Sequence, residues 1–160
     1  MNIVYLMKQD VNAYDFLEKN LKEKFNILMP EIKKGPHGKP YFEESGIYFN
    51  ISHTESLQAV AIGTSEVGVD IEKIRPVNLQ VAKRFSKEEY DYIKAKDSTE
   101  RFFEIWTKKE AYLKYKGTGI SGGLNSFSVF EMPEKINTFV IDGYIISVCS
   151  KKDCKIEVVK

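Results

Sequence analysis

The sequence predicts an α+β fold made of two similar lobes. The first half carries three short strand-forming runs separated by polar turns, and the second half carries amphipathic helices followed by a strong hairpin signal. Each half therefore offers helical material and about three consecutive strands. We expect residues 1–76 to form an N-terminal lobe and residues 77–160 a C-terminal lobe, as two halves of one compact unit.

Apolar periodicity and turn residues define the elements of the first half. Apolar residues recur at helical spacing over residues 12–25, whereas the glycines and prolines of residues 33–40 favour a loop. The expected order is a strand at 2–7, a helix at 12–25, the loop at 33–40, and strands at 46–52, 57–63 and 67–73.

Capping and turn signals define the second half. Ser86 and Glu89 have the spacing of a capping box that opens a helix, and Gly117 is typical of a helix end. Asp142-Gly143 predicts a tight hairpin turn. The expected order is helices at 79–84, 86–95 and 99–116, a loop at 118–123, strands at 126–132, 137–141 and 144–150, and an edge strand at 155–159.

Composition narrows the classes of function. The 160 residues have a formal net charge of +1, so the chain has no bulk attraction to nucleic acid or to a membrane surface. No apolar run has the length of a membrane span, and the first residues do not resemble a signal peptide. Two cysteines do not make a disulfide framework. A reducing cytoplasm is the expected location.

Two acidic residues alternate with apolar residues in the strand at 67–73. Asp70 and Glu72 lie on the face opposite to Val67, Val69 and Ile71, about 6.6 Å apart. At that separation both carboxylates can bind one hard cation placed between them. A solvated strand face with two unpaired acids is the alternative, and the pattern alone favours it.

Glu110 strengthens the case for a cation. In the helix at 99–116 it falls inside the apolar arc, between the directions of Trp106 and Phe103. A carboxylate that faces a core is costly unless it is paired or bound to a metal. A surface ion pair with Lys114, four residues on, is the alternative.

Three carboxylates suit Mg²⁺, or Mn²⁺, better than zinc, for which the sequence offers no His/Cys cluster. Because magnesium commonly completes its shell with phosphate oxygens, a phosphate-bearing substrate is expected. Ser52 and His53, at the end of a strand, are candidates to hold phosphate, although a plain polar turn is the alternative. Gly38-Lys39-Pro40 likewise reads as a turn with one exposed lysine.

Taken together, these segments resemble the 4'-phosphopantetheinyl transferase superfamily, in particular its surfactin-synthetase-activating type. The resemblance extends from about residue 38 to 129. It rests on five motifs in the family's order: Gly38-Lys39-Pro40, Phe49 to Thr54, Val67 to Glu72, Arg84 to Tyr90, and Trp106 to Lys114 followed by Gly117-Thr118-Gly119. The fold that it implies is a pseudo-dimer of two similar lobes, each with helices packed on a small, mainly antiparallel sheet.

The resemblance also implies an activity and a site. The activity is transfer of the 4'-phosphopantetheine group from coenzyme A to a serine of an apo acyl or peptidyl carrier protein, with release of adenosine 3',5'-bisphosphate. The implied residues are Asp70, Glu72 and Glu110 for Mg²⁺, His53 and Lys114 for the pyrophosphate, Ser52 and Lys109 beside it, and Lys39 and Pro40 at the nucleotide end.

The candidates for the base that accepts the serine proton are Glu110 first and Glu89 second, the capping box being the alternative role of Glu89. Lys114 would assist on the phosphate. We expect a monomer with no nucleic-acid or membrane partner. Two other functions stay open: a relative that binds coenzyme A or a carrier protein without catalysis, and a Mg²⁺-dependent phosphodiesterase that needs no acceptor protein.

Overall fold

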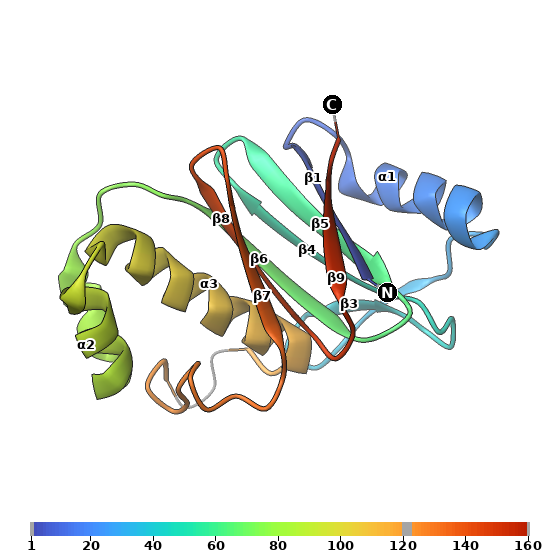
Figure 1. Cartoon of the computed structure of the whole chain (residues 1–160). Helices are drawn as coiled ribbons and strands as arrows, with labels where there is room; N and C mark the ends of the chain where they lie inside the picture. The colour runs from blue at the N-terminus through green and yellow to red at the C-terminus, as the bar shows by residue number, and fades with distance from the viewer. Residues whose placement is uncertain (1, 120–122, 160) are drawn as a thin grey trace.

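A computed structural model describes residues 2–119 and 123–159 and shows an α+β protein with small, mainly antiparallel sheets (Figure 1). The first sheet has the order β4-β5-β1-β9, in which only the β1–β9 pair is parallel. Helix α1 packs beside this sheet and continues into a π-helical turn, η1. The bounds are β1 Asn2–Lys8, α1 Ala13–Asn20, η1 Leu21–Phe25, β4 Tyr48–Thr54, β5 Leu57–Gly63 and β9 Cys154–Val158.

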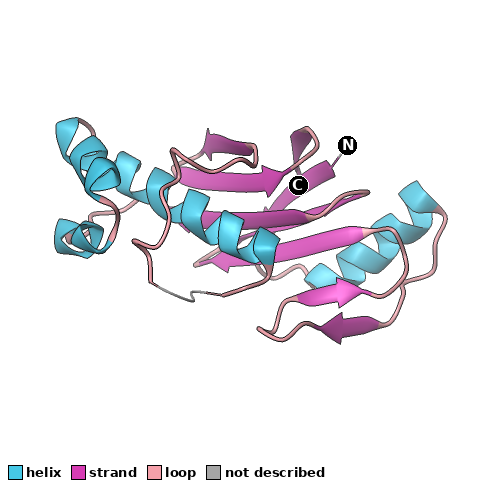
Figure 2. Ribbon diagram, turned by 90° about the horizontal axis from the view of Figure 1, so that it is seen from below, coloured by secondary structure: helices cyan, strands magenta, loops and turns pink. Residues whose placement is uncertain are grey.

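The second sheet has the order β6-β8-β7, and the long helix α3 lies along it (Figure 2). The capping box at Ser86 and Glu89 is present, and Gly117 ends α3 in the left-handed conformation, as predicted. The element at 79–84 is a 3-10 helix. The bounds are β6 Val67–Lys73, η2 Leu79–Arg84, α2 Lys87–Ala95, α3 Ser98–Lys116, β7 Ile136–Ile141 and β8 Tyr144–Ser150.

Two predicted segments differ from the structure. The expected loop at 33–40 overlaps a two-stranded sheet, β2 Ile32–Lys34 and β3 Pro40–Phe42, whose strands are joined by a short turn. The expected strand at 126–132 is wrong: this segment consists of turns. Its backbone groups find partners in distant side chains, because Val129 N–H donates to Glu89 and the Phe127 carbonyl accepts from Lys109. The predicted loop at 118–123 lies partly outside the described residues.

The two larger sheets meet where their edge strands β4 and β6 lie side by side. The buried amide of Asn50 on β4 makes the connection, since its Oδ1 accepts the backbone N–H of Val69 on β6 at 2.9 Å. Apolar residues from both sheets, including Val4 and Val69, share one core cluster beneath this junction. The β4–β6 junction therefore fixes the position of the acidic strand against the first sheet.

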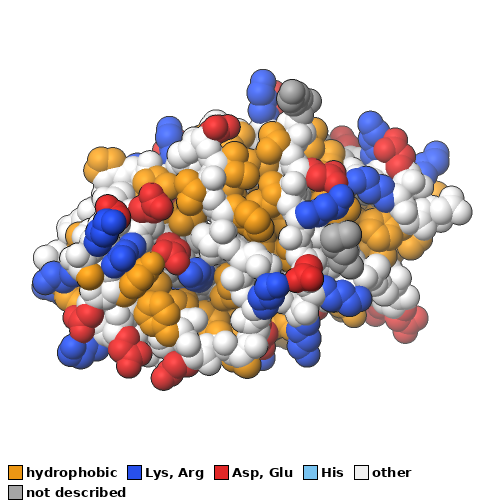
Figure 3. Space-filling view, in the orientation of Figure 1, with side chains coloured by type: hydrophobic (Ala, Val, Ile, Leu, Met, Phe, Trp, Pro, Cys, Tyr) orange, Lys and Arg blue, Asp and Glu red, His pale blue; other side chains and the backbone are white. Residues whose placement is uncertain are grey.

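The surface carries charges of both signs. On the face drawn in Figure 3, Lys and Arg side chains are intermingled with Asp and Glu side chains, and apolar side chains lie between them. This mixture agrees with the net charge of +1. Among the described residues, no helix is both long enough and apolar enough to cross a membrane.

Candidate active site

The site is built where α3 lies directly against β6. Gly68 makes this close approach possible: a Cβ at this position would lie 2.1 Å from the Ala111 carbonyl oxygen and 2.3 Å from the Tyr115 nitrogen. Only a residue without a side chain fits there. The two elements thereby bring Asp70 and Glu72 of β6 next to Glu110 and Lys114 of α3.

Asp70 is the most deeply buried of the three predicted acids, with 5% of its surface exposed. Its Oδ1 accepts the Ser52 hydroxyl at 2.8 Å and the Lys114 ammonium at 2.7 Å. Its Oδ2 is buried and has no hydrogen-bond partner among the residues that the structure describes. Burial raises the pKa of Asp70 despite the opposing effect of Lys114. Additional positive charge near Asp70 would therefore stabilise its ionised form.

Glu72 and Glu110 are half-buried beside Asp70. Burial is the main cause that raises the pKa of each, and the charge of Asp70 raises both further. The charge of Glu72 also raises the pKa of Glu110. Arg75 partly opposes the rise in the pKa of Glu72, because its guanidinium lies 3.3 Å from Glu72 Oε2. Negative charge on a neighbouring acid thus raises the pKa values of both Glu72 and Glu110.

These acids fit a hard divalent cation by two observations. A cation at Asp70 would satisfy the unpaired Oδ2, and it would relieve the repulsion among the three carboxylates. Within the described ranges, however, no three His, Cys, Asp or Glu side chains converge into a ready group for an ion. The ammonium of Lys114 stands at Asp70 instead.

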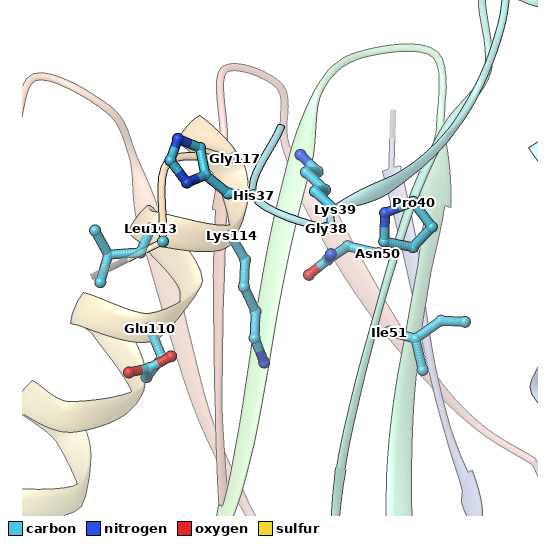
Figure 4. Close-up of a pocket in the computed structure, with 11 residues that line it drawn as sticks. His37, Gly38, Lys39, Pro40, Asn50, Ile51, Glu110, Leu113, Lys114 and Gly117 are labelled. Carbon is cyan, nitrogen blue, oxygen red and sulfur yellow. The ribbon is translucent and has the colours of Figure 1, made fainter. Parts of the chain in front are cut away.

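A cavity of about 250 Å³ opens beside this cluster, between α3, β4 and the loop before β3 (Figure 4). Glu110 and Lys114 form its helix side, and Lys39 and Pro40 lie at its loop side. Figure 4 shows Lys114 extending from α3 toward the strands. Among the described residues, the lining consists of His37, Gly38, Lys39, Pro40, Asn50, Ile51, Glu110, Leu113, Lys114, Gly117 and Gly119.

The lining includes residues that sequence reasoning did not single out. His37 comes into the cavity as the residue before the Gly38-Lys39-Pro40 motif, and adjacency to that motif was its only signal. Asn50 and Ile51 belong to the Phe49 to Thr54 motif, in which the sequence indicates only Ser52 and His53 as site residues. Ser52 lies close to the acids through Asp70 and Lys114, whereas His53 is exposed and is not part of the lining.

Lys39 is held by the protein itself. Its ammonium pairs with Glu66 and donates to the Tyr115 carbonyl oxygen at 3.2 Å, near the carboxyl end of α3. This arrangement ties the loop to the helix that carries Glu110 and Lys114. Lys39 therefore borders the cavity with its stem while its charged group is already paired.

The structure does not bring Lys109 and Glu89 to this cavity. Both side chains are fully buried and form an ion pair at 2.9 Å, which leaves the Lys109 ammonium with the Leu124 and Phe127 carbonyl oxygens as its other partners. Burial lowers the pKa of Lys109. Its three N–H groups are all used inside the protein. Glu89 also accepts the N–H groups of Ser86 and Val129.

Comparison with known proteins gives a consistent result. Residues 66–155 match the family model described as the 4'-phosphopantetheinyl transferase superfamily. The chain is 37% identical to the 4'-phosphopantetheinyl transferase Sfp of Bacillus subtilis over 134 residues, which cover 71% of this chain and 60% of that protein. It is 36% identical to the 4'-phosphopantetheinyl transferase ffp of Bacillus subtilis over 154 residues, covering 82% and 69%.

A third relative is the 4'-phosphopantetheinyl transferase gsp of Aneurinibacillus migulanus, with 40% identity over 106 residues, or 64% of this chain and 43% of that protein. This chain thus spans between about two fifths and two thirds of the length of these relatives. The matched range contains Asp70, Glu72, Glu110 and Lys114. The chain belongs to the 4'-phosphopantetheinyl transferase superfamily.

Proposed function

We propose that this protein transfers the 4'-phosphopantetheine group of coenzyme A to a serine of an apo acyl or peptidyl carrier protein, releasing adenosine 3',5'-bisphosphate. One observation carries the proposal: Glu110 and Lys114 line a cavity between α3 and β4, and Glu110 is repelled by the neighbouring acids Asp70 and Glu72. Such a site attracts a divalent cation together with the phosphates that accompany it. The names of the related transferases support the same chemistry.

Asp70, Glu72 and Glu110 are the proposed ligands of Mg²⁺, with Mn²⁺ as a substitute. The unpaired Oδ2 of Asp70 supports this assignment. When bound, the ion would neutralise negative charge on the diphosphate oxygens. Each carboxylate contributes an oxygen ligand of the kind that these ions prefer.

The diphosphate is proposed to lie near Lys114 and Ser52, with His53 toward its outer side. Lys114 can reach the cavity from α3, and its ammonium supplies a positive charge to a phosphate oxygen. The nucleotide end is proposed to lie against Pro40 and the stem of Lys39, which border the same cavity. Lys109, whose N–H groups are already used, would act by holding residues 124–129 in place.

Glu110 is the proposed general base. In the reaction the serine oxygen forms a bond to the pantetheine-side phosphorus, the bond from that phosphorus to the bridging oxygen breaks, and the serine proton passes to the base. Burial raises the pKa of Glu110 in the site without a metal ion, which makes its carboxylate a better proton acceptor than an exposed one. Glu89, the second candidate, is buried among three partners, which favours its structural role.

We also propose that the chain works as a monomer in the cytoplasm, as two lobes divided near residue 76. The helices and strands found on each side of that position support the two-lobe description. Two pairings cross it, since β6 pairs with β8 and β1 pairs with β9. The free cysteines Cys149 and Cys154 are compatible with a reducing compartment.

Mass spectrometry of an apo carrier protein tests the proposal. After incubation with this protein, coenzyme A and Mg²⁺, the carrier should gain the mass of one phosphopantetheine group. Glu110→Gln should abolish that gain, whereas Glu100→Gln, an exposed acid on the same helix, should leave it unchanged. Hydrolysis of coenzyme A without a carrier would favour a phosphodiesterase instead. Binding of coenzyme A with no reaction on several carriers would favour a non-catalytic relative.

A further inference from the structure

The ammonium of Lys114 lies against Asp70 rather than in open solvent. It lies 2.7 Å from Asp70 Oδ1 and 2.9 Å from the Ser52 hydroxyl, and 30% of the side chain is exposed. The Ser52 hydroxyl in turn donates to the same oxygen of Asp70. Lys114 therefore supplies the nearest positive charge to the most buried acid of the site.

The other cations near the site have different partners. Arg75 pairs with Glu72 at the outer end, 3.3 Å from its Oε2. Lys39 is held by Glu66 and by the Tyr115 carbonyl oxygen. Lys109 is fully buried against Glu89. Lys114 is thus the lysine that can leave Asp70 by rotating its stem into the adjoining cavity, which it already lines.

A divalent ion and an ammonium group cannot both be close neighbours of Asp70 at low cost. Two like charges a few ångströms apart in a half-buried site repel strongly, because the surrounding protein screens them less than water does. An ion held by Oδ2 of Asp70 would lie a few ångströms from the ammonium on Oδ1, and the repulsion between the two charges favours movement of Lys114 away from Asp70. A diphosphate would then offer the displaced ammonium a new partner, with the geometry of a charge-assisted hydrogen bond.

We infer that Lys114 is an internal counter-ion that competes with the divalent cation for Asp70 and moves to the diphosphate when the cation binds. The inference rests on the cation site of the proposed function. Its consequence is that cation and diphosphate bind cooperatively: each one stabilises the position of Lys114 that the other requires. Lys114 is then a positioning residue for the acids as well as a partner of the phosphate.

Titration with Mn²⁺ alone, followed by the loss of the electron paramagnetic resonance signal of the free ion, tests the competition. Lys114→Met should bind Mn²⁺ about tenfold more tightly than the wild type, because the competing charge is gone. Lys116→Met removes an exposed lysine two residues away on the same helix and should bind like the wild type. Equal or weaker binding by Lys114→Met would overturn the inference, and so would the absence of Mn²⁺ binding in all three proteins.

A second measurement uses the wild type and does not depend on a variant that folds. A short pulse of an amine-acetylating reagent, read by peptide mass spectrometry, reports how freely each lysine reacts. Saturating Mg²⁺ should raise the labelling of Lys114 several-fold, and adding adenosine diphosphate should lower it again, while Lys116 stays constant. Labelling of Lys114 that does not respond to Mg²⁺ would contradict the displacement.

The inference and the proposed function can fail separately. Transfer of phosphopantetheine by the wild type together with unchanged Mn²⁺ affinity in Lys114→Met would remove the counter-ion role and leave the function intact. Tighter Mn²⁺ binding by Lys114→Met without any transfer to a carrier would support the counter-ion role and count against the function.

Discussion

Replacement of Gly68 by alanine tests how the site depends on the close packing of α3 against β6. The added Cβ would lie 2.1 Å from the Ala111 carbonyl oxygen, whereas ordinary contacts begin at 3.4 Å, so the helix must retreat by about 1.3 Å at this point. The atoms that block it belong to the helix backbone, which cannot rotate away. Glu110 and Lys114 would move with the helix, away from Asp70.

Two effects of different size follow from this displacement. Overpacking of this kind costs about 1–3 kcal/mol of folding free energy. Misplacement of reacting groups by about 1 Å can reduce turnover about a hundredfold. We therefore expect Gly68→Ala to be moderately destabilised in urea unfolding, to bind Mn²⁺ more weakly, and to lose about two orders of magnitude in the rate of carrier modification.

Two glycines provide matched controls. At Gly35 a Cβ would have only an ordinary contact of 3.6 Å, so Gly35→Ala should change little. At Gly63, outside the cavity lining, a Cβ would lie 1.9 Å from Asn2 Oδ1, so Gly63→Ala should lose stability and keep its rate per folded molecule. Full activity of folded Gly68→Ala, or stability equal to that of Gly35→Ala, would refute the reasoning.

Three further predictions concern single contacts. Asn50→Ala leaves the buried Val69 N–H without its acceptor and should cost about 1–3 kcal/mol in urea unfolding, an expectation that an unchanged midpoint would contradict. Glu89→Gln leaves the buried Lys109 charge without its counter-ion and should cost about 3–5 kcal/mol in the same assay; a loss below 1 kcal/mol would argue against the pair. Without metal, the raised pKa of Glu110 means that the folded wild type binds more protons than the unfolded chain between the ordinary pKa of 4.5 and the raised value, so the wild type loses stability as the pH rises through this window. Glu110→Gln lacks this loss and should become increasingly more thermostable than the wild type over the same window. A difference in melting temperature that does not vary with pH would count against a raised pKa.

Local patterns predicted most of the secondary structure. The alternation of Val67, Val69 and Ile71 identified β6, and all three side chains are buried. The same pattern left the opposite face of the strand undecided between solvent and a cation site. The structure shows that α3 covers this face at Gly68. Because α3 lies about forty residues further along the chain, the sequence of the strand alone does not indicate this contact.

Long-range side-chain contacts account for what was not predicted. The turns at 126–132 look like a strand because Phe127 and Val129 alternate with polar residues, yet their backbone groups bind Glu89 and Lys109 instead of a neighbouring strand. Glu110 was predicted to face inward, and it lines the cavity half-buried. Lys114 pairs with Asp70, which lies 44 positions away in the sequence. Helical periodicity indicates only partners on the same helix, so it suggested Glu110 for that lysine and could not indicate Asp70.

The parallel pairing of β9 with β1 has a consequence for how the chain is made. Residues 2–6 obtain one of their two strand neighbours only from residues 154–158, so one edge of β1 remains open until those residues have been synthesised. Contacts across so long a stretch slow folding, because the intervening chain must first be ordered. On the ribosome, the first sheet can therefore be completed only after β9 has emerged, and until then the open edge of β1 can pair with other chains.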